Sequence, residues 1–169
     1  MLQAIPTLTA GAAMLLAVAA MHDAATRTIP DWVPAGLLVL GVALRALDGH
    51  ALPGAAAAAM VFAVCFLAWL RGWLGGGDVK LAAAFALVPP PGQAAAFVLA
   101  TALAGGVLAL LYTVLVRLVP RPAPGRRTGL LARCLKAEAW RISRRGPLPY
   151  AAAIAAGGFY VLQPSLGIG

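Results

Sequence analysis

The chain has 169 residues, of which 62% are hydrophobic and only 11% are charged, and its formal net charge is +8. A soluble domain usually carries about 25% charged residues, so this composition excludes an ordinary soluble protein and indicates a polytopic membrane protein. The apolar stretches are rich in Ala, Leu and Gly and show no alternating polarity, which favours helices over a membrane β-barrel. We therefore predict an all-α membrane helix bundle that forms a single domain over residues 1–169.

Six apolar segments are candidates to cross the bilayer, which requires about 20 helical residues. They cover approximately residues 4–22, 32–48, 54–71, 78–92, 94–117 and 148–165. The fourth segment is short because three consecutive prolines, at 89–91, end it, and we expect it to be tilted, re-entrant or buried within the bundle. The first segment is expected to remain as a helix and not to be a cleaved signal peptide, because no basic residue precedes it.

The basic residues predict the orientation of these segments. The loops around 23–31, 72–77 and 118–147 alternate onto one side, and nearly all Lys and Arg residues fall on that side. The positive-inside rule makes it the cytoplasmic side, with both termini outside the inner (plasma) membrane. On the opposite side the nearest basic residue is Arg45, which we expect to pair with Asp48 at a spacing of i, i+3.

The positive charge is concentrated in residues 117–145, which contain nine basic residues and one acidic residue. Apolar residues recur there at helical spacing, at Leu131, Leu135, Ala139 and Ile142. This pattern predicts an interfacial amphipathic helix, within a basic loop at 118–147, that lies on anionic lipid. Docking to a protein partner is an alternative, whereas nucleic-acid binding is disfavoured because no recognition motif is present.

Acidic residues are rare in this chain, and two of them fall at the ends of apolar segments. The five are Asp23, Asp31, Asp48, Asp78 and Glu138. The predicted orientation, which does not depend on them, puts Asp23 and Asp78 on the same side and at similar depth. Carboxylates within a membrane are costly and usually functional. The structural alternatives are a helix N-cap for Asp78, which follows three glycines, and a polar stop at the membrane surface for Asp23.

Two carboxylates at matching depth are the groups that an aspartyl protease requires. One accepts a proton from water and the other donates a proton to the substrate carbonyl, and two close acids do not both ionise readily. The helix dipole predicts that Asp78, at a helix N-terminus, is ionised and that Asp23, at a helix C-terminus, holds the shared proton. The alternative functions are a proton-coupled transporter that uses the same acids as a relay and a catalytically inert membrane scaffold.

The remaining polar residues have structural interpretations. Asp31 follows Ile29 and Pro30 and is expected to cap the second helix. His22 and His50 should lie near opposite faces of the membrane, and no CxxC pair occurs. The sequence therefore predicts neither a metal site nor a cofactor.

Three strings in this order resemble the signatures of type IV prepilin peptidases. The string at 23–31 is similar to their first signature, an Asp followed six residues later by Ile-Pro-Asn, although this chain has Asp31 in place of the Asn. The string at 75–81 resembles their second signature, GxGD followed by a Lys, and the Pro-rich string at 147–157 is similar to a motif of their last helix.

The resemblance implies a GxGD-type membrane aspartyl endopeptidase with Asp23 and Asp78 as its catalytic pair. Supporting positions would be Ile29, Pro30, Gly75, Gly77 and Lys80: the two glycines would let the backbone turn so that the aspartates face each other, and Lys80 would be an interfacial anchor. The implied substrate is a prepilin or pseudopilin with a short basic leader and an apolar helix, cleaved at the cytoplasmic face. The family's large cytoplasmic region with paired cysteines is lacking, which implies a peptidase-only form like those of tight-adherence (Flp/Tad) pilus systems or the archaeal preflagellin peptidases.

Overall fold

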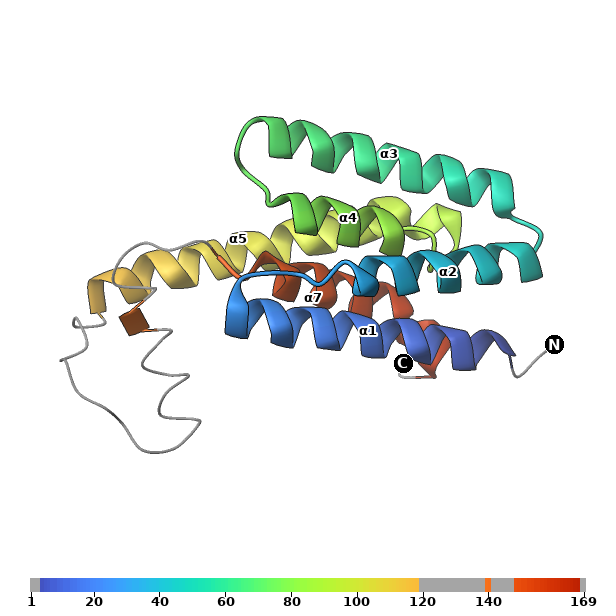
Figure 1. The fold of residues 1–169 in the computed structure, drawn as a ribbon, viewed down its shortest axis with the longest axis horizontal. Helices are drawn as coiled ribbons and strands as arrows, with labels where there is room; N and C mark the ends of the chain where they lie inside the picture. The colour runs from blue at the N-terminus through green and yellow to red at the C-terminus, as the bar shows by residue number, and fades with distance from the viewer. Residues whose placement is uncertain (1–3, 119–138, 141–147, 168–169) are drawn as a thin grey trace. The chain divides into compact units, whose positions relative to one another are not determined.

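The computed structural model describes residues 4–118, 139–140 and 148–167, with helices joined by short turns (Figure 1). The elements are α1 (Ala4–Thr26), α2 (Trp32–Leu47), α3 (Ala51–Leu70), α4 (Gly76–Phe85), the 3-10 turn η1 (Pro91–Gln93), α5 (Ala94–Leu118), α7 (Tyr150–Leu162) and the 3-10 turn η2 (Gln163–Leu166). No strand occurs within these ranges. The predicted all-α membrane bundle is confirmed.

The chain forms two compact units, Met1–Gly105 with Pro149–Gly169, and Gly106–Leu148. The second unit is described only over the C-terminal part of α5, the helical pair Ala139–Trp140, and Leu148. The predicted interfacial helix in the basic loop therefore lies outside the described residues, apart from that pair. The first unit contains α1 to α4, the start of α5, and α7, and it holds every residue of the predicted catalytic pair.

Three helical segments in the described part of the chain have the length and hydropathy to cross a membrane: Ala4–Thr26, Ala51–Leu70 and Pro91–Leu118. The apolar helix α2 is shorter, with 16 residues. Helices α4 and α7 have 10 and 13 residues, which correspond to about 15 and 20 Å at 1.5 Å per residue. The expected fourth and sixth spans therefore do not cross a core of about 30 Å as single α-helices.

The short fourth segment is buried within the first unit. Phe85 ends α4 with none of its surface exposed, and the chain then continues without regular structure through Val88, which is also buried. Arg45 of α2 donates from Nη2 to the carbonyl oxygen of Val88 at 3.2 Å, and it pairs with Asp48 at 2.6 Å, as the spacing predicted. Irregular backbone is tolerated at membrane depth where protein groups satisfy it.

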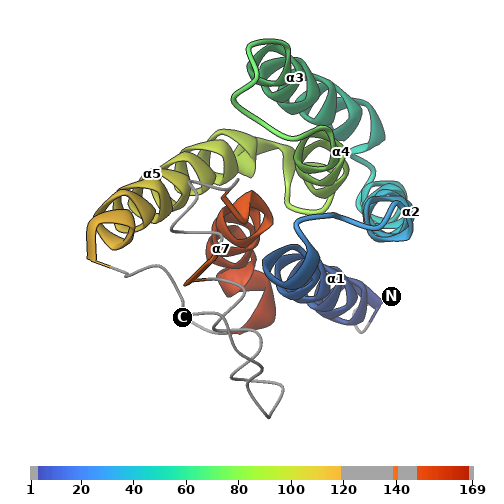
Figure 2. The same ribbon diagram turned by 60° about the vertical axis from the view of Figure 1, so that its left-hand side comes forward.

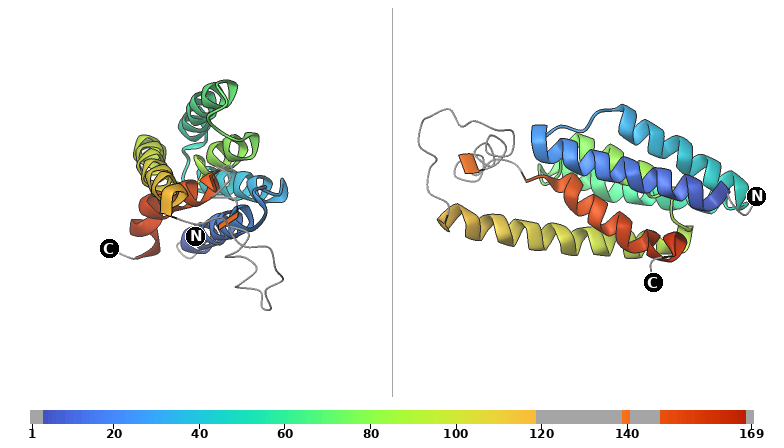
Figure 3. Two further views of the ribbon diagram at one scale, coloured as in Figure 1. Left: turned by 90° about the vertical axis from the view of Figure 1, so that its left-hand side faces the viewer. Right: turned by 90° about the horizontal axis from the view of Figure 1, so that it is seen from below.

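Helix α7 packs directly alongside α1 and also contacts α4 (Figures 2 and 3). Its buried residues cover more than half of the helix surface: Ala151, Ala153, Ile154, Ala155, Gly157, Gly158, Val161 and Leu162. Ala156, Phe159 and Tyr160 are exposed on the remaining face. A helix with so wide a buried face packs against several neighbours at once. Because most of the buried residues are small, the neighbouring backbones can approach closely.

Two adjacent glycines in α7 make this approach possible. A Cβ at Gly157 would lie 2.7 Å from the backbone nitrogen of Thr101 in α5, with the Thr101 hydroxyl closer still. A Cβ at Gly158 would lie 3.0 Å from Phe85 of α4 and would overlap Leu16 of α1. The two positions therefore set the spacing of α7 from its neighbours on two sides.

Replacing Gly157 with Ala should destabilise the protein, because the new methyl group meets backbone that cannot move as a side chain can. Overpacking of this kind costs about 1–3 kcal/mol, which thermal unfolding of the purified protein in detergent would detect as a lowered midpoint. Gly106→Ala is the matched control, since a Cβ there meets nothing within 4 Å. Equal midpoints for the two variants would contradict the close packing at Gly157.

Candidate active site

Asp23 lies in the last turn of α1, and its side chain is turned into the protein. Only 6% of the residue is exposed. Its Oδ2 accepts a hydrogen bond from the backbone N–H of Ala151 at 3.2 Å. Ala151 belongs to the first turn of α7, where N–H groups have no partner within the helix and the dipole favours an anion. A carboxylate at the end of one helix thus satisfies the start of another, 128 positions later in the chain.

Asp78 is the third residue of α4, and its carboxylate folds back over the start of its own helix. Oδ2 accepts a hydrogen bond from the N–H of Gly75, the N-cap residue, at 3.2 Å. This contact is the returning half of a capping box. The capping role considered for Asp78 is therefore present in the structure, and it leaves the other carboxylate oxygen available for a second partner.

Asp23 and Asp78 are close enough to interact electrostatically, although α1 and α4 are separated by two other helices in the sequence. Asp78 belongs to α4, outside the segments that are long enough to cross a membrane. Burial, and secondly the nearby carboxylate of Asp23, raise the pKa of Asp78 to about 6, while the Gly75 hydrogen bond opposes the shift. Two carboxylates that repel each other in this way do not both ionise readily, so the pair tends to retain one proton.

The helix-end argument assigns the shared proton to Asp23 because Asp23 lies at the C-terminal end of α1. The structure adds the N-terminus of α7, whose Ala151 N–H donates a hydrogen bond to Asp23, and the pKa of Asp78 is raised to about 6. The place of the shared proton stays a prediction.

Gly75 and Gly77, the two glycines that the sequence suggests as supporting positions, are important because they carry no side chain. Gly75 has φ −76°, which any residue can adopt, and the positive φ in this turn belongs to Gly72. A Cβ on Gly75 would lie 2.8 Å from Oδ2 of Asp78, and one on Gly77 would lie 3.3 Å from Cβ of Ile29. The expectation that Gly75 and Gly77 supply conformational freedom is therefore replaced by a requirement for close approach.

The Ile29 contact joins the two sequence signatures. Ile29 is partly buried and packs against the core, and it lies on the start of α4 through Gly77. Pro30 follows and accepts the N–H of Val33 in the first turn of α2. The loop that carries both residues is held by His22, whose Nδ1 lies 2.8 Å from the carbonyl oxygen of Thr28. The first signature therefore supplies both an acid and the surface that supports the second.

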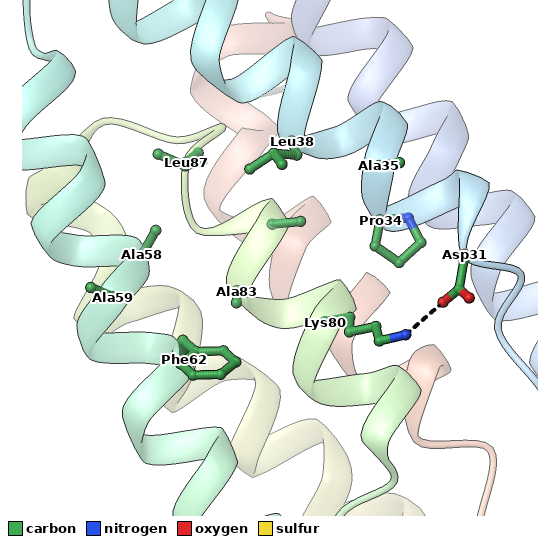
Figure 4. A pocket seen from close by; sticks show the side chains of 11 residues that line it. Asp31, Pro34, Ala35, Leu38, Ala58, Ala59, Phe62, Lys80, Ala83 and Leu87 are labelled. Atoms are coloured by element: carbon green, nitrogen blue, oxygen red, sulfur yellow. Dashed lines mark hydrogen bonds and ion pairs between the residues drawn. The ribbon is translucent and has the colours of Figure 1, made fainter.

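Lys80 forms an ion pair with Asp31. Its Nζ donates to Oδ1 of Asp31 at 2.8 Å (Figure 4). The Lys80 side chain is 60% exposed and the Asp31 side chain 81% exposed. Asp31 occupies the predicted N-cap position of α2, but its side chain makes no capping hydrogen bond. The pair lies at a groove of about 530 Å³ between α2, α3 and α4, whose lining includes Leu38, Phe62 and Leu87 but neither Asp23 nor Asp78.

Three groups near Asp23 and Asp78 could hardly have been predicted from the sequence. The N–H of Ala151 could not be predicted because every residue except proline has such a backbone donor. Tyr150 interacts electrostatically with Asp78 and with Cys65 of α3, and Cys65 interacts with Asp78. Tyr150 could have been suspected from its place in the Pro-rich string at 147–157, whereas Cys65 could not. Among the residues that the structure describes, no three His, Cys, Asp or Glu side chains group as metal ligands.

Comparison with known proteins gives a match to one family model. No curated protein and no solved structure matches the chain significantly. The model of the type IV leader peptidase family matches residues 10–110, a range that includes both aspartates and both glycine contacts. The match covers more than half of the sequence, and this chain therefore belongs to the type IV leader peptidase family.

Proposed function

We propose that the chain is an aspartyl endopeptidase that removes the leader peptide of prepilin-like proteins, with Asp23 and Asp78 as its catalytic pair. The observation that supports this most directly is the approach of two carboxylates from α1 and α4, at the ends of their helices, with the pKa of Asp78 raised to about 6. A structural cap needs only one of them. Two interacting acids in one buried place are the arrangement that acid and base catalysis of peptide hydrolysis requires.

The contacts of each carboxylate give it a role. Asp23, held by the Ala151 N–H, is the base that takes a proton from the attacking water. Asp78 holds the shared proton and donates it to the carbonyl oxygen of the scissile bond. Collapse of the tetrahedral intermediate then breaks the C–N bond. The leaving amine receives the proton that the water gave to Asp23, and the hydroxyl formed on the former carbonyl oxygen returns its proton to Asp78. The hydrolysis consumes one water and needs no metal or cofactor.

The expected orientation in the membrane indicates what kind of substrate the pair would cleave. The charge bias of the loops supports a position of the pair at the cytoplasmic face of the inner membrane, with both termini outside. A substrate cleaved there carries a soluble basic leader on the cytoplasmic side of an apolar helix, as in prepilins and pseudopilins of the Flp type. Residues 117–145, with nine basic groups, would bind anionic lipid, and the screening length of about 8–10 Å limits their repulsion of the leader.

Asp23→Asn and Asp78→Asn should each reduce leader cleavage by about 100- to 10,000-fold, because each removes one partner in proton transfer. The measurement is co-expression with a candidate Flp-type prepilin, with the loss of the leader followed by gel shift. Processing that survives either substitution would rule out the aspartyl mechanism. Proton transport without cleavage by the wild-type chain would support the transporter alternative.

Asp31→Asn is the matched control for both variants. It makes the same chemical change at an aspartate that is 81% exposed and pairs only with the exposed Lys80 among the described residues. Exposed ion pairs contribute about 0–1 kcal/mol, so processing should be retained. Asp48→Ala is less suitable as a control because Asp48 neutralises the buried Arg45.

The pair should also be visible in a titration. Asp78 should titrate near pH 6, and Asp23→Asn should lower the pKa of Asp78, because the charge of Asp23 is one of the causes that raise it. Infrared titration of the carboxyl band in the purified protein would measure this shift, with Asp31→Asn leaving it in place. An Asp78 pKa that does not change in Asp23→Asn would show that the two carboxylates do not interact.

A further inference from the structure

Tyr150 brings a third polar side chain to the catalytic pair. It is the first residue of α7 and directly precedes Ala151, whose N–H holds Asp23 at 3.2 Å. Its half-buried side chain interacts electrostatically with Asp78. The same helix end therefore carries a backbone donor for one carboxylate and a phenol near the other.

The phenol ring is held in place by Gly105 of α5. A Cβ at position 105 would lie 2.7 Å from Cε2 of Tyr150, 2.8 Å from its hydroxyl oxygen and 3.0 Å from Cζ. Any side chain there would displace the hydroxyl end of the ring. Because α5 presents only backbone at this point, the position of the hydroxyl is determined by two helices, α5 and α7.

The hydroxyl is available for a ligand, unlike the other donors nearby. The N–H groups of Ala151 and Gly75 are already bonded to Asp23 and Asp78. Within the described residues, no group accepts a hydrogen bond from the Tyr150 hydroxyl. Packing against Gly105 needs only the ring, so a phenylalanine would serve for that purpose. The hydroxyl adds a hydrogen-bond donor beside the acid of the pair.

We propose that the Tyr150 hydroxyl donates a hydrogen bond to the carbonyl oxygen of the scissile peptide bond and stabilises the negative charge that develops on this oxygen in the transition state, as the proton of Asp78 is transferred to it. This inference rests on the proposed function, since it assigns a role within the same reaction. Asp78 protonates that oxygen from one side, and Tyr150 contacts it from the start of α7. No bond is made or broken by the phenol, which keeps its proton throughout.

The test compares Tyr150→Phe with the wild-type chain on the prepilin that the wild-type chain processes. Removal of one oxyanion donor typically lowers kcat by about 100- to 1,000-fold, and we expect a loss of that order with KM changed by less than about threefold. Ring packing is retained in this variant, so the thermal unfolding midpoint should stay at the wild-type value. A kcat within twofold of wild type, or a loss that appears only in KM, would overturn the proposal.

Gly105→Ala tests the same hydroxyl without altering the tyrosine. It should lower kcat because the new methyl group pushes the ring aside, and it should have little further effect in the Tyr150→Phe background. Gly106→Ala is its matched control, with open space around the added Cβ. Additive losses in the double variant would also overturn the proposal. If Asp23→Asn and Asp78→Asn stay active, the proposed function fails, whatever Tyr150→Phe does.

Discussion

The hydrogen bond from the Ala151 N–H to Asp23 is the contact on which the rest of the site depends. It is buried, it joins the end of α1 to the start of α7, and it gives the Ala151 N–H an acceptor that its own helix lacks. Hydrogen bonds to a buried carboxylate reduce its desolvation penalty. Loss of this contact would therefore take a donor from Asp23 and leave an N–H group at the start of α7 unsatisfied.

The site is built from helix ends, which explains why short helices suit it. Helices α4 and α7 have 10 and 13 residues, fewer than the roughly 20 that a helix needs to cross the bilayer core. Each N-terminus meets an aspartate, α7 through Ala151 and α4 through Asp78 on the Gly75 N–H. Small residues at the helix crossings, such as Gly157 and Gly158, let the elements approach until these ends converge.

Much of the local structure could be predicted because it depends on patterns along the chain. Hydrophobic length predicted α1, α3 and α5, and the i, i+3 spacing predicted the Arg45–Asp48 pair. Long-range partners could not be predicted in the same way. Asp31 was expected to cap α2, but it pairs with Lys80, 49 positions away, because α4 packs against α2. The contact between Ile29 and Gly77 could not be predicted for the same reason, since it joins residues that are far apart in the sequence.

The sequence by itself determined the class of the protein, the candidate acids and the motifs that carry its family, since composition, spacing and charge bias are properties of the chain alone. The tertiary structure decided which groups surround each acid. It brought the start of α7 to Asp23, and it brought Asp23 close enough to Asp78 for the two carboxylates to interact. It also brought Tyr150 near Asp78. The ionisation of a carboxylate depends on its neighbours in space, which are set by how the helices pack.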